Sequence, residues 1–201
     1  RVFSYDWTQL TDWIYLSHSG QMKGQLGYGI TLFAEDEFYK NILFEDNYGL
    51  EISFEKSFSK SISFNIKPKF GTEIIRVDAP YQAKNTGLGL GIELKPSDEF
   101  KLNFRMDQSK SIRFENDEVV YSDMIARARF EYQATTFLNF RLVAQYHRYY
   151  DTFDIQPLIS YQPGPFSIFY FGTSRSYDTS FSEWEESYGQ IYLKVQKLFS
   201  F

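Results

Sequence analysis

Hydrophobic and polar residues alternate one by one along most of this chain. Between Ser61 and Phe70, for example, apolar residues occupy even positions and polar residues occupy odd positions. This period of two is typical of a β-strand with one apolar and one polar face. The same alternation predicts strands over Lys23–Phe33, Tyr48–Ser57, Ser61–Phe70, Gly87–Lys95, Glu99–Asp107, Asp123–Gln133 and Phe137–His147.

Four further segments extend the series to about eleven strands, with no helix. They are Gln9–Ser17, Ile155–Tyr161, Phe166–Ser174 and the terminal stretch Gln190–Phe201. Short connections alternate with longer ones, and this pattern is typical of an up-and-down antiparallel meander. The longer connections are expected at Ala34–Asn47, Gly71–Asn85, Gln108–Ser122, Arg148–Thr152 and Arg175–Glu186. The pattern therefore predicts an all-β fold, an antiparallel up-and-down β-barrel over residues 1–201.

Alternation alone fits both a soluble barrel with an apolar interior and a membrane barrel with an apolar exterior. The chain has no run of about 18 apolar residues, so no transmembrane helix is expected. Aromatic residues make up 20% of the chain, and several on the apolar faces come close to the short turns, as in an interfacial girdle. They are Phe54, Phe100, Phe130, Tyr132, Phe140 and Tyr161. These features favour a transmembrane β-barrel in the outer membrane of a Gram-negative bacterium.

The C-terminal strand strengthens this interpretation. Val195, Phe199 and Phe201 belong to an apolar set at every second position, and the last residue is aromatic. Such an ending resembles the signal read by the barrel assembly machinery of the outer membrane. Lys197 is the one discordant residue in this set. The expected partners are this machinery, outer-membrane lipid and lipopolysaccharide, and other subunits of an envelope complex.

Strand parity leads to a further expectation. Single-chain bacterial barrels have even strand numbers, whereas about eleven strands are predicted here. If the C-terminus is periplasmic, the first strand starts on the extracellular side. The chain is therefore expected to be the C-terminal part of a larger even-stranded barrel, with residues 1–7 as the end of a loop and upstream strands or a domain preceding them.

The composition and the motifs of the chain argue against several kinds of binding site. The chain has no cysteine, which excludes disulfides and thiolate metal sites. Its net charge of −5 argues against a nucleic-acid partner. No HExxH motif or phosphate loop occurs, and the glycine-rich run Gly87–Glu93 lies in a strand rather than before a helix. No metal or cofactor is expected.

Charged residues occupy the polar face in several strand centres. The ones expected to face a lumen are Lys101, Arg105, Arg127, Arg129, Glu131 and Arg141. Two interpretations stay open. They form a basic stripe that selects anions or holds a plug, or they form Arg–Glu pairs with Glu131 and Glu93 that fill and stiffen the interior.

The last part of the chain also carries a resemblance, over roughly residues 125–201. The matching positions are Tyr132, Gln133, Thr136, Leu138, Arg141, Gln145 and Tyr146, then Pro157, Leu158, Ser160, Tyr161, Pro163, Gly164, Phe169, Tyr170 and Gly172, and finally Lys194, Leu198, Phe199 and Phe201. This set resembles the C-terminal barrels of a poorly characterised family of large bacterial outer-membrane proteins, in which a carbohydrate-binding-like β-sandwich precedes the barrel. The resemblance implies location and fold rather than an activity.

The leading functional hypothesis is a non-catalytic barrel that acts as a membrane anchor, a porin-like transport pore or a complex subunit. One alternative is a barrel-embedded hydrolase that uses His147, with Asp151 and Asp154 close in sequence. Another is a soluble ligand-binding barrel. The sequence defines no catalytic residue for either alternative.

Removal of Phe201 should slow assembly, because the terminal aromatic is the predicted recognition signal. The measurement is the fraction of protein that migrates in folded form on unheated gels after expression in a Gram-negative host. Replacement of the neighbouring Ser200 by Ala is the control and should assemble normally. Unchanged assembly without Phe201 would contradict the signal.

Overall fold

The computed structural model describes residues 2–3, 9–180 and 184–197. All regular elements within these ranges are β-strands, and none of the described residues form a helix that could cross a membrane. The strands are β1 (Val2–Phe3), β2 (Gln9–Met22), β3 (Leu26–Tyr39), β4 (Ile42–Ser59), β5 (Ile62–Ile75), β6 (Tyr81–Leu94), β7 (Phe100–Arg113), β8 (Val119–Gln133), β9 (Leu138–His147), β10 (Thr152–Gly164), β11 (Ser167–Asp178) and β12 (Glu185–Lys197).

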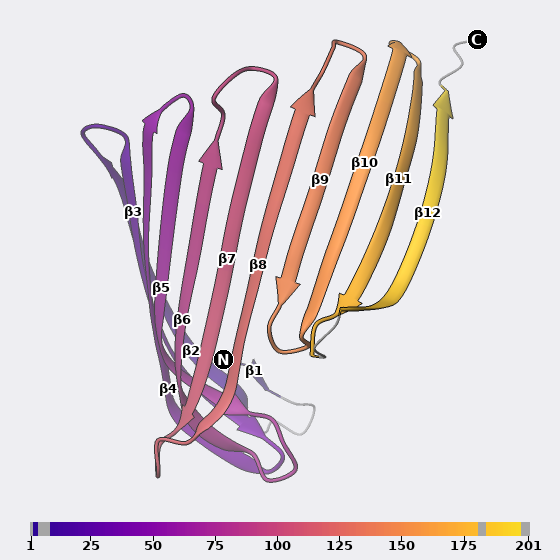
Figure 1. Cartoon of the computed structure of the whole chain (residues 1–201). Coiled ribbons are helices and arrows are strands. Elements are labelled where there is room, and N and C mark those ends of the chain that lie inside the picture. The colour runs from indigo at the N-terminus through magenta and orange to yellow at the C-terminus, as the bar shows by residue number, and fades with distance from the viewer. Residues whose placement is uncertain (1, 4–8, 181–183, 198–201) are drawn as a thin grey trace. The chain divides into compact units, whose positions relative to one another are not determined.

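The strands follow one another in a single sheet in chain order, and consecutive strands are hydrogen-bonded to each other (Figure 1). Neighbours such as β9 and β10 pair antiparallel. The all-β, up-and-down antiparallel fold is therefore confirmed, and β2–β12 are the eleven long strands that the alternation predicts. Within the segment expected as a loop end, Val2 and Phe3 form β1 and pair with β2. Closure into a barrel and insertion into a membrane stay predictions.

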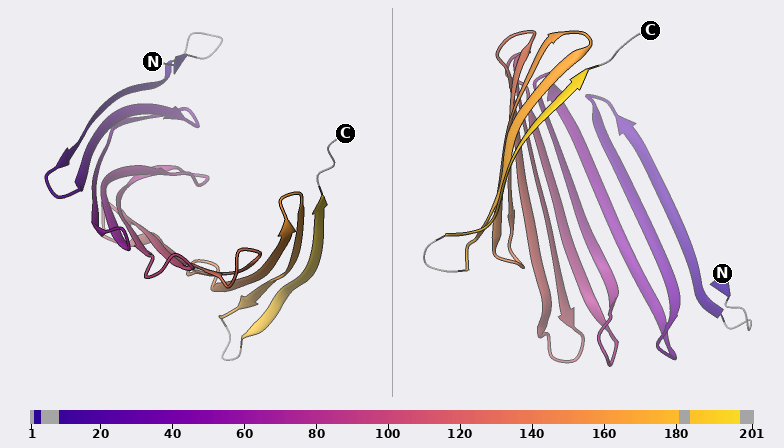
Figure 2. Two further views of the ribbon diagram at one scale, coloured as in Figure 1. Left: turned by 90° about the horizontal axis from the view of Figure 1, so that it is seen from above. Right: turned by 90° about the vertical axis from the view of Figure 1, so that its right-hand side faces the viewer.

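The residues group into two compact units, which are described separately. Unit 1 comprises residues 1–57, 65–90 and 107–123, and unit 2 comprises residues 58–64, 91–106 and 124–201. Figure 2 shows β2 to β4 of unit 1, in indigo and purple, side by side, and β9 to β12 of unit 2, in orange and yellow, side by side.

Four of the five predicted long loops are too long, because the strands extend into them from both sides and leave a shorter connection. In the expected loop Ala34–Asn47, β3 runs to Tyr39 and β4 begins at Ile42. The turn between them has only Lys40 and Asn41, both with positive φ (47° and 62°), as a two-residue type I′ hairpin requires. Both faces of these extensions carry polar residues, so side-chain alternation disappears although backbone pairing continues. The expected loop at Arg148–Thr152 is close to the observed connection between β9 and β10.

Cross-strand pairing sorts the side chains of each unit into an apolar and a polar face. In unit 2, Phe171 of β11 lies opposite Ile159 of β10 and Leu193 of β12. In unit 1, Leu32 of β3 lies opposite Leu16 of β2 and Leu50 of β4. Directly opposed residues of an antiparallel pair share one face, so these pairs place the apolar sets of neighbouring strands together.

The polar face is the crowded one in both units. Leu193, on the apolar face of unit 2, is 72% exposed. Ser111 and Asn47, on the polar face of unit 1, are 0% and 2% exposed. Val143, on the polar face of unit 2, is 6% exposed and lies opposite Arg129. Side chains of the polar face therefore pack on one another, whereas those of the apolar face project outward.

Two glycines permit this crowding in unit 1. The ring of Phe33 lies where a side chain at Gly49 would be, and a side chain at Gly71 would meet the main-chain carbonyl of Tyr48. The Phe33 ring thus packs directly on the main chain of Gly49 and leaves no space for a side chain there. This arrangement requires glycine at both positions.

Replacement of Gly71 by Ala should lower the free energy of unfolding by about 1–3 kcal/mol, a typical cost of overpacking. The added methyl group would press on the backbone of β4, which can relieve the contact only by a shift of the strand. Urea unfolding of the folded protein measures the change. Gly164→Ala is the matched control, because nothing lies within 4 Å of the added carbon; equal stability of the two variants would contradict the close approach.

Candidate functional site

Five basic side chains gather on the polar face of β7, β8 and β9 in unit 2. The ring of Phe100 contacts that of Phe130 at 4.7 Å, so the even-numbered residues of these strands share the apolar face. The odd-numbered residues lie on the opposite, polar face because successive side chains alternate. The basic residues in this set are Lys101, Arg105, Arg127, Arg129 and Arg141.

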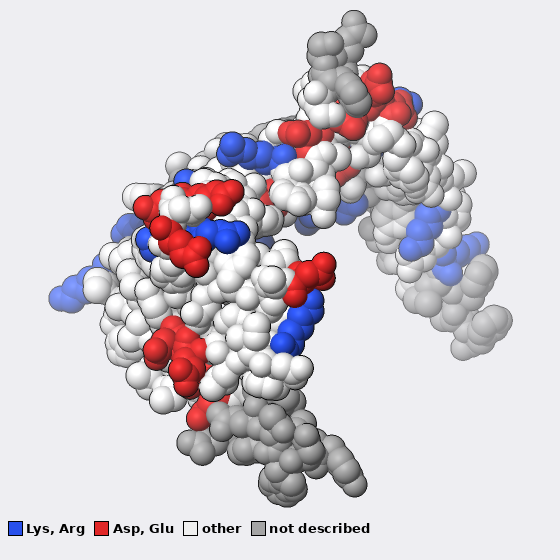
Figure 3. All heavy atoms as spheres, turned by 90° about the horizontal axis from the view of Figure 1, so that it is seen from below, with Lys and Arg blue, Asp and Glu red and all other residues white. Residues whose placement is uncertain are grey.

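Two of the five are paired with a carboxylate. Lys101 Nζ lies 3.0 Å from Glu93, and Arg129 is hydrogen-bonded to Glu131. All four side chains are partly open to solvent, so each pair contributes at most about 1 kcal/mol to stability. Ion pairs of this kind recur in unit 1, as between Lys84 and Asp117, and Figure 3 shows basic and acidic residues near one another at several places of the face in view.

The other three basic side chains have no such partner. Within the described residues, Arg105, Arg127 and Arg141 make no ion pair or hydrogen bond through their side chains, and the Nε atom of Arg141 is buried without one. Arg141 lies opposite Glu131, but Glu131 binds Arg129. The interpretation as Arg–Glu pairs thus accounts for two of five cations. Whether this face lines a lumen stays a prediction.

The polar face of unit 1 carries a different arrangement. Glu51 of β4 binds both Lys67 and Lys69 of β5, at 3.4 and 2.9 Å. Beside this triad is a hollow of about 270 Å³, whose lining includes Phe33, Gly49, Glu51, Lys69, Glu73 and Asn85. Gly89 of β6 lies next to the triad, because a carbon added there would lie 3.4 Å from Lys67 Cβ and 3.3 Å from Asp107 Oδ1.

A buried hydrogen-bond network adjoins the hollow. The Ser111 hydroxyl donates to Glu73, and Asn85 donates to Ser111 and Ser109 at 3.1 and 3.2 Å. These hydrogen bonds connect β5, β6 and β7 on the polar face. Sequence reasoning missed this network because Glu73, Asn85 and Ser111 fall in the segments interpreted as loops.

Ion pairs also hold the strand extensions of unit 1. Arg76 Nη2 donates a hydrogen bond to Glu37 Oε2 at 2.9 Å, and Nη1 lies 2.9 Å from Oε1 of the same carboxylate. The guanidinium lies 4.7 Å from the ring centre of Tyr39. The hydrogen bond to Glu37 raises the pKa of Arg76 above its ordinary value. This two-pronged geometry suits Arg better than Lys.

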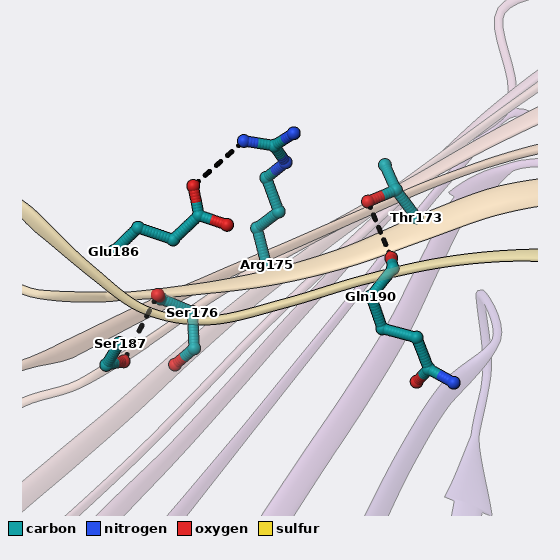
Figure 4. A network of polar contacts seen from close by, with 6 residues as sticks. All are labelled: Thr173, Arg175, Ser176, Glu186, Ser187 and Gln190. Atoms are coloured by element: carbon teal, nitrogen blue, oxygen red, sulfur yellow. Dashed lines mark hydrogen bonds and ion pairs between the residues drawn. The ribbon is translucent and has the colours of Figure 1, made fainter.

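In unit 2, an ion pair marks the end of the apolar face between β11 and β12 (Figure 4). Arg175 Nη1 lies 2.9 Å from Glu186, next to hydrogen bonds from Thr173 to the carbonyl of Gln190 (2.8 Å) and from Ser187 to the carbonyl of Ser176 (3.1 Å). Beyond it, the ring of Trp184 contacts those of Phe153 and Tyr177, at 5.2 and 6.3 Å. Of these residues, Arg175, Ser176, Tyr177, Trp184 and Glu186 fall within the predicted loop Arg175–Glu186.

The two histidines lie in separate surroundings. The ring of His147 meets Tyr150 edge-to-face at 4.6 Å, and the neighbouring Tyr146 hydroxyl donates to Asp151 at 3.4 Å. His18 Nε2 is hydrogen-bonded to the Tyr28 hydroxyl at 3.1 Å. The described residues contain no group of three His, Asp or Glu side chains placed to hold a metal ion. The hydrolase based on His147 remains a hypothesis.

Of the predicted C-terminal assembly signal, only Val195 lies within the described residues. Val195 of β12 lies opposite Phe169 on the apolar face and is exposed. Phe199 and Phe201 lie outside the described residues. Their role in assembly stays a prediction.

Comparison with family models, with curated proteins and with solved structures found no match to the chain. The resemblance of residues 125–201 to outer-membrane barrels therefore also stays a prediction.

Replacement of Ser111 by Ala should lower the free energy of unfolding by about 1–3 kcal/mol, because Glu73 and Asn85 would lose a buried partner. Denaturant titration of the folded protein measures this. Ser19→Ala is the control, since Ser19 is exposed on β2 of the same unit and should change stability little. A loss of similar size in both variants would show that the network is not the cause.

Proposed function

We propose that this chain is the membrane-spanning part of an outer-membrane β-barrel, which serves as an anchor, a pore or a complex subunit without catalysis by these residues. The proposal requires the apolar face to contact lipid and the polar face to line the interior. The soluble alternative requires the opposite orientation.

The observation that carries the proposal is the distribution of exposure between the two faces. A soluble barrel packs its apolar side chains inside, so its apolar face is the crowded one. Here the buried side chains belong to the polar face, as with Ser111 in unit 1 and Val143 in unit 2, whereas Leu193 projects outward. Side chains such as Ser111 and Asn85 satisfy one another by hydrogen bonds, as polar groups in a packed interior must.

The dimensions of the apolar face in unit 2 give further support. On β10, the apolar face runs from Phe153 to Tyr161, which is about 27 Å along a strand. A tilt of about 40° reduces this to about 21 Å, close to the apolar band of about 25 Å in outer-membrane barrels. Aromatic contacts lie near both ends, with Trp184 against Phe153 at one end and Tyr161 against Phe169 at the other. Aromatic girdles are typical of membrane interfaces.

Replacement of Leu193 by Arg distinguishes lipid from water at the apolar face. If the apolar face contacts lipid, an Arg near the middle of the apolar band should lower the free energy of unfolding by about 2–4 kcal/mol. In water, the change should be nearly neutral, because Leu193 is 72% exposed. Unfolding of the protein reconstituted in phospholipid vesicles measures the difference. Gln190→Arg, on the polar face of the same strand, is the control.

A stability of Leu193→Arg equal to that of the control, together with recovery of the wild-type chain in the soluble fraction without detergent, would overturn the proposal. For a membrane-inserted protein, current across a planar lipid bilayer separates the pore from the anchor: a pore conducts, and a plugged anchor does not.

A further inference from the structure

Three arginines of unit 2 stand at successive levels of the polar face. Arg127 and Arg129 of β8 lie opposite Gln145 and Val143 of β9, and Arg141 of β9 lies opposite Glu131. Neighbouring levels are two residues apart, which is about 7 Å along a strand. The three arginines therefore span about 14 Å on two adjacent strands, a series that we call the arginine ladder.

The ladder carries uncompensated positive charge, although the chain as a whole has a net charge of −5. Only Arg129 is paired, with Glu131. Arg127 and Arg141 have no ion pair or hydrogen bond through their side chains in the described part of the chain, and Arg141 keeps a buried Nε atom without a partner. A buried charged donor without an acceptor is costly unless an anion satisfies it.

The next strand, β10, places few negative charges near the arginine ladder. On β10, Leu158 lies opposite Arg141, and Gln156 lies opposite Val143, the partner of Arg129. Asp154 is the one carboxylate of β10 in these rows, and it lies opposite Gln145, one strand away from Arg127. An anion beside Arg141 or Arg129 would thus meet neutral side chains on β10, and Glu131, which binds Arg129, would compete with it.

We propose that the arginine ladder binds oxyanions of the phosphate class and passes them from level to level along the polar face. Each guanidinium offers several donors in a planar fork that fits two oxygens of a phosphate. Several weak sites in series favour passage, because each site must release what it binds. The proposal rests on the proposed function, since it takes the polar face as the lining of a pore.

Titration of inorganic phosphate into the detergent-folded full chain at low ionic strength tests the ladder, with the heat of binding as readout. Wild type should bind, and Arg127→Gln and Arg141→Gln should each weaken binding by about tenfold, the loss expected for one charge-assisted contact. Arg148→Gln is the matched control. Arg148 lies in the turn after β9, so its removal changes the net charge equally but leaves the ladder intact.

No binding by wild type, or the same affinity in all four proteins, would overturn the ladder. For wild type that conducts in planar bilayers, the reversal potential under a salt gradient should favour anions and shift toward cations only in the two ladder variants. The membrane proposal fails on a different observation. If the chain is recovered in the soluble fraction without detergent, that proposal is wrong, whatever the phosphate titration shows.

Discussion

Backbone hydrogen bonding between consecutive antiparallel strands is the interaction on which everything else in this protein depends. Each strand pairs with its neighbours in the sequence, and each pair fixes which side chains stand opposite one another. A shift of register by one residue would exchange the two faces of a strand. The apolar row through Ile159, Phe171 and Leu193, and the charged rows behind it, exist only because the register holds across several strands.

The two faces then divide the physical roles. The polar face is held by contacts between side chains: the Glu51–Lys69 ion pair, the Ser111 network and the packing of Phe33 on Gly49. The apolar face makes few such contacts and leaves Leu193 and its neighbours exposed. Large exposed apolar faces mark sites of contact with other proteins, ligands or membranes, which is the physical basis for the proposed lipid contact. The basic residues follow the same division in unit 2, because the five that β7–β9 contribute to this unit all lie on the polar face, where water or an anion can reach them.

Sequence reasoning located the eleven long strands but not their full lengths. Period-two alternation is strong where one face is apolar, as between Ser61 and Phe70, and it disappears where both faces are polar. Residues such as Glu37, Glu73 and Ser111 were therefore assigned to loops, although they lie in β3, β5 and β7. The predicted basic set was found on one face, but the sequence could not tell which members are paired.

By itself, the sequence determined that this chain folds into antiparallel strands with an apolar and a polar face, because alternation is a local property of each strand. The tertiary structure decided which face is crowded, that Glu131 binds Arg129 rather than Arg141, and that the arginines stand at successive levels. These facts depend on register and on the close approach of separate strands. Distances between strands are not encoded in the spacing of residues along any one of them.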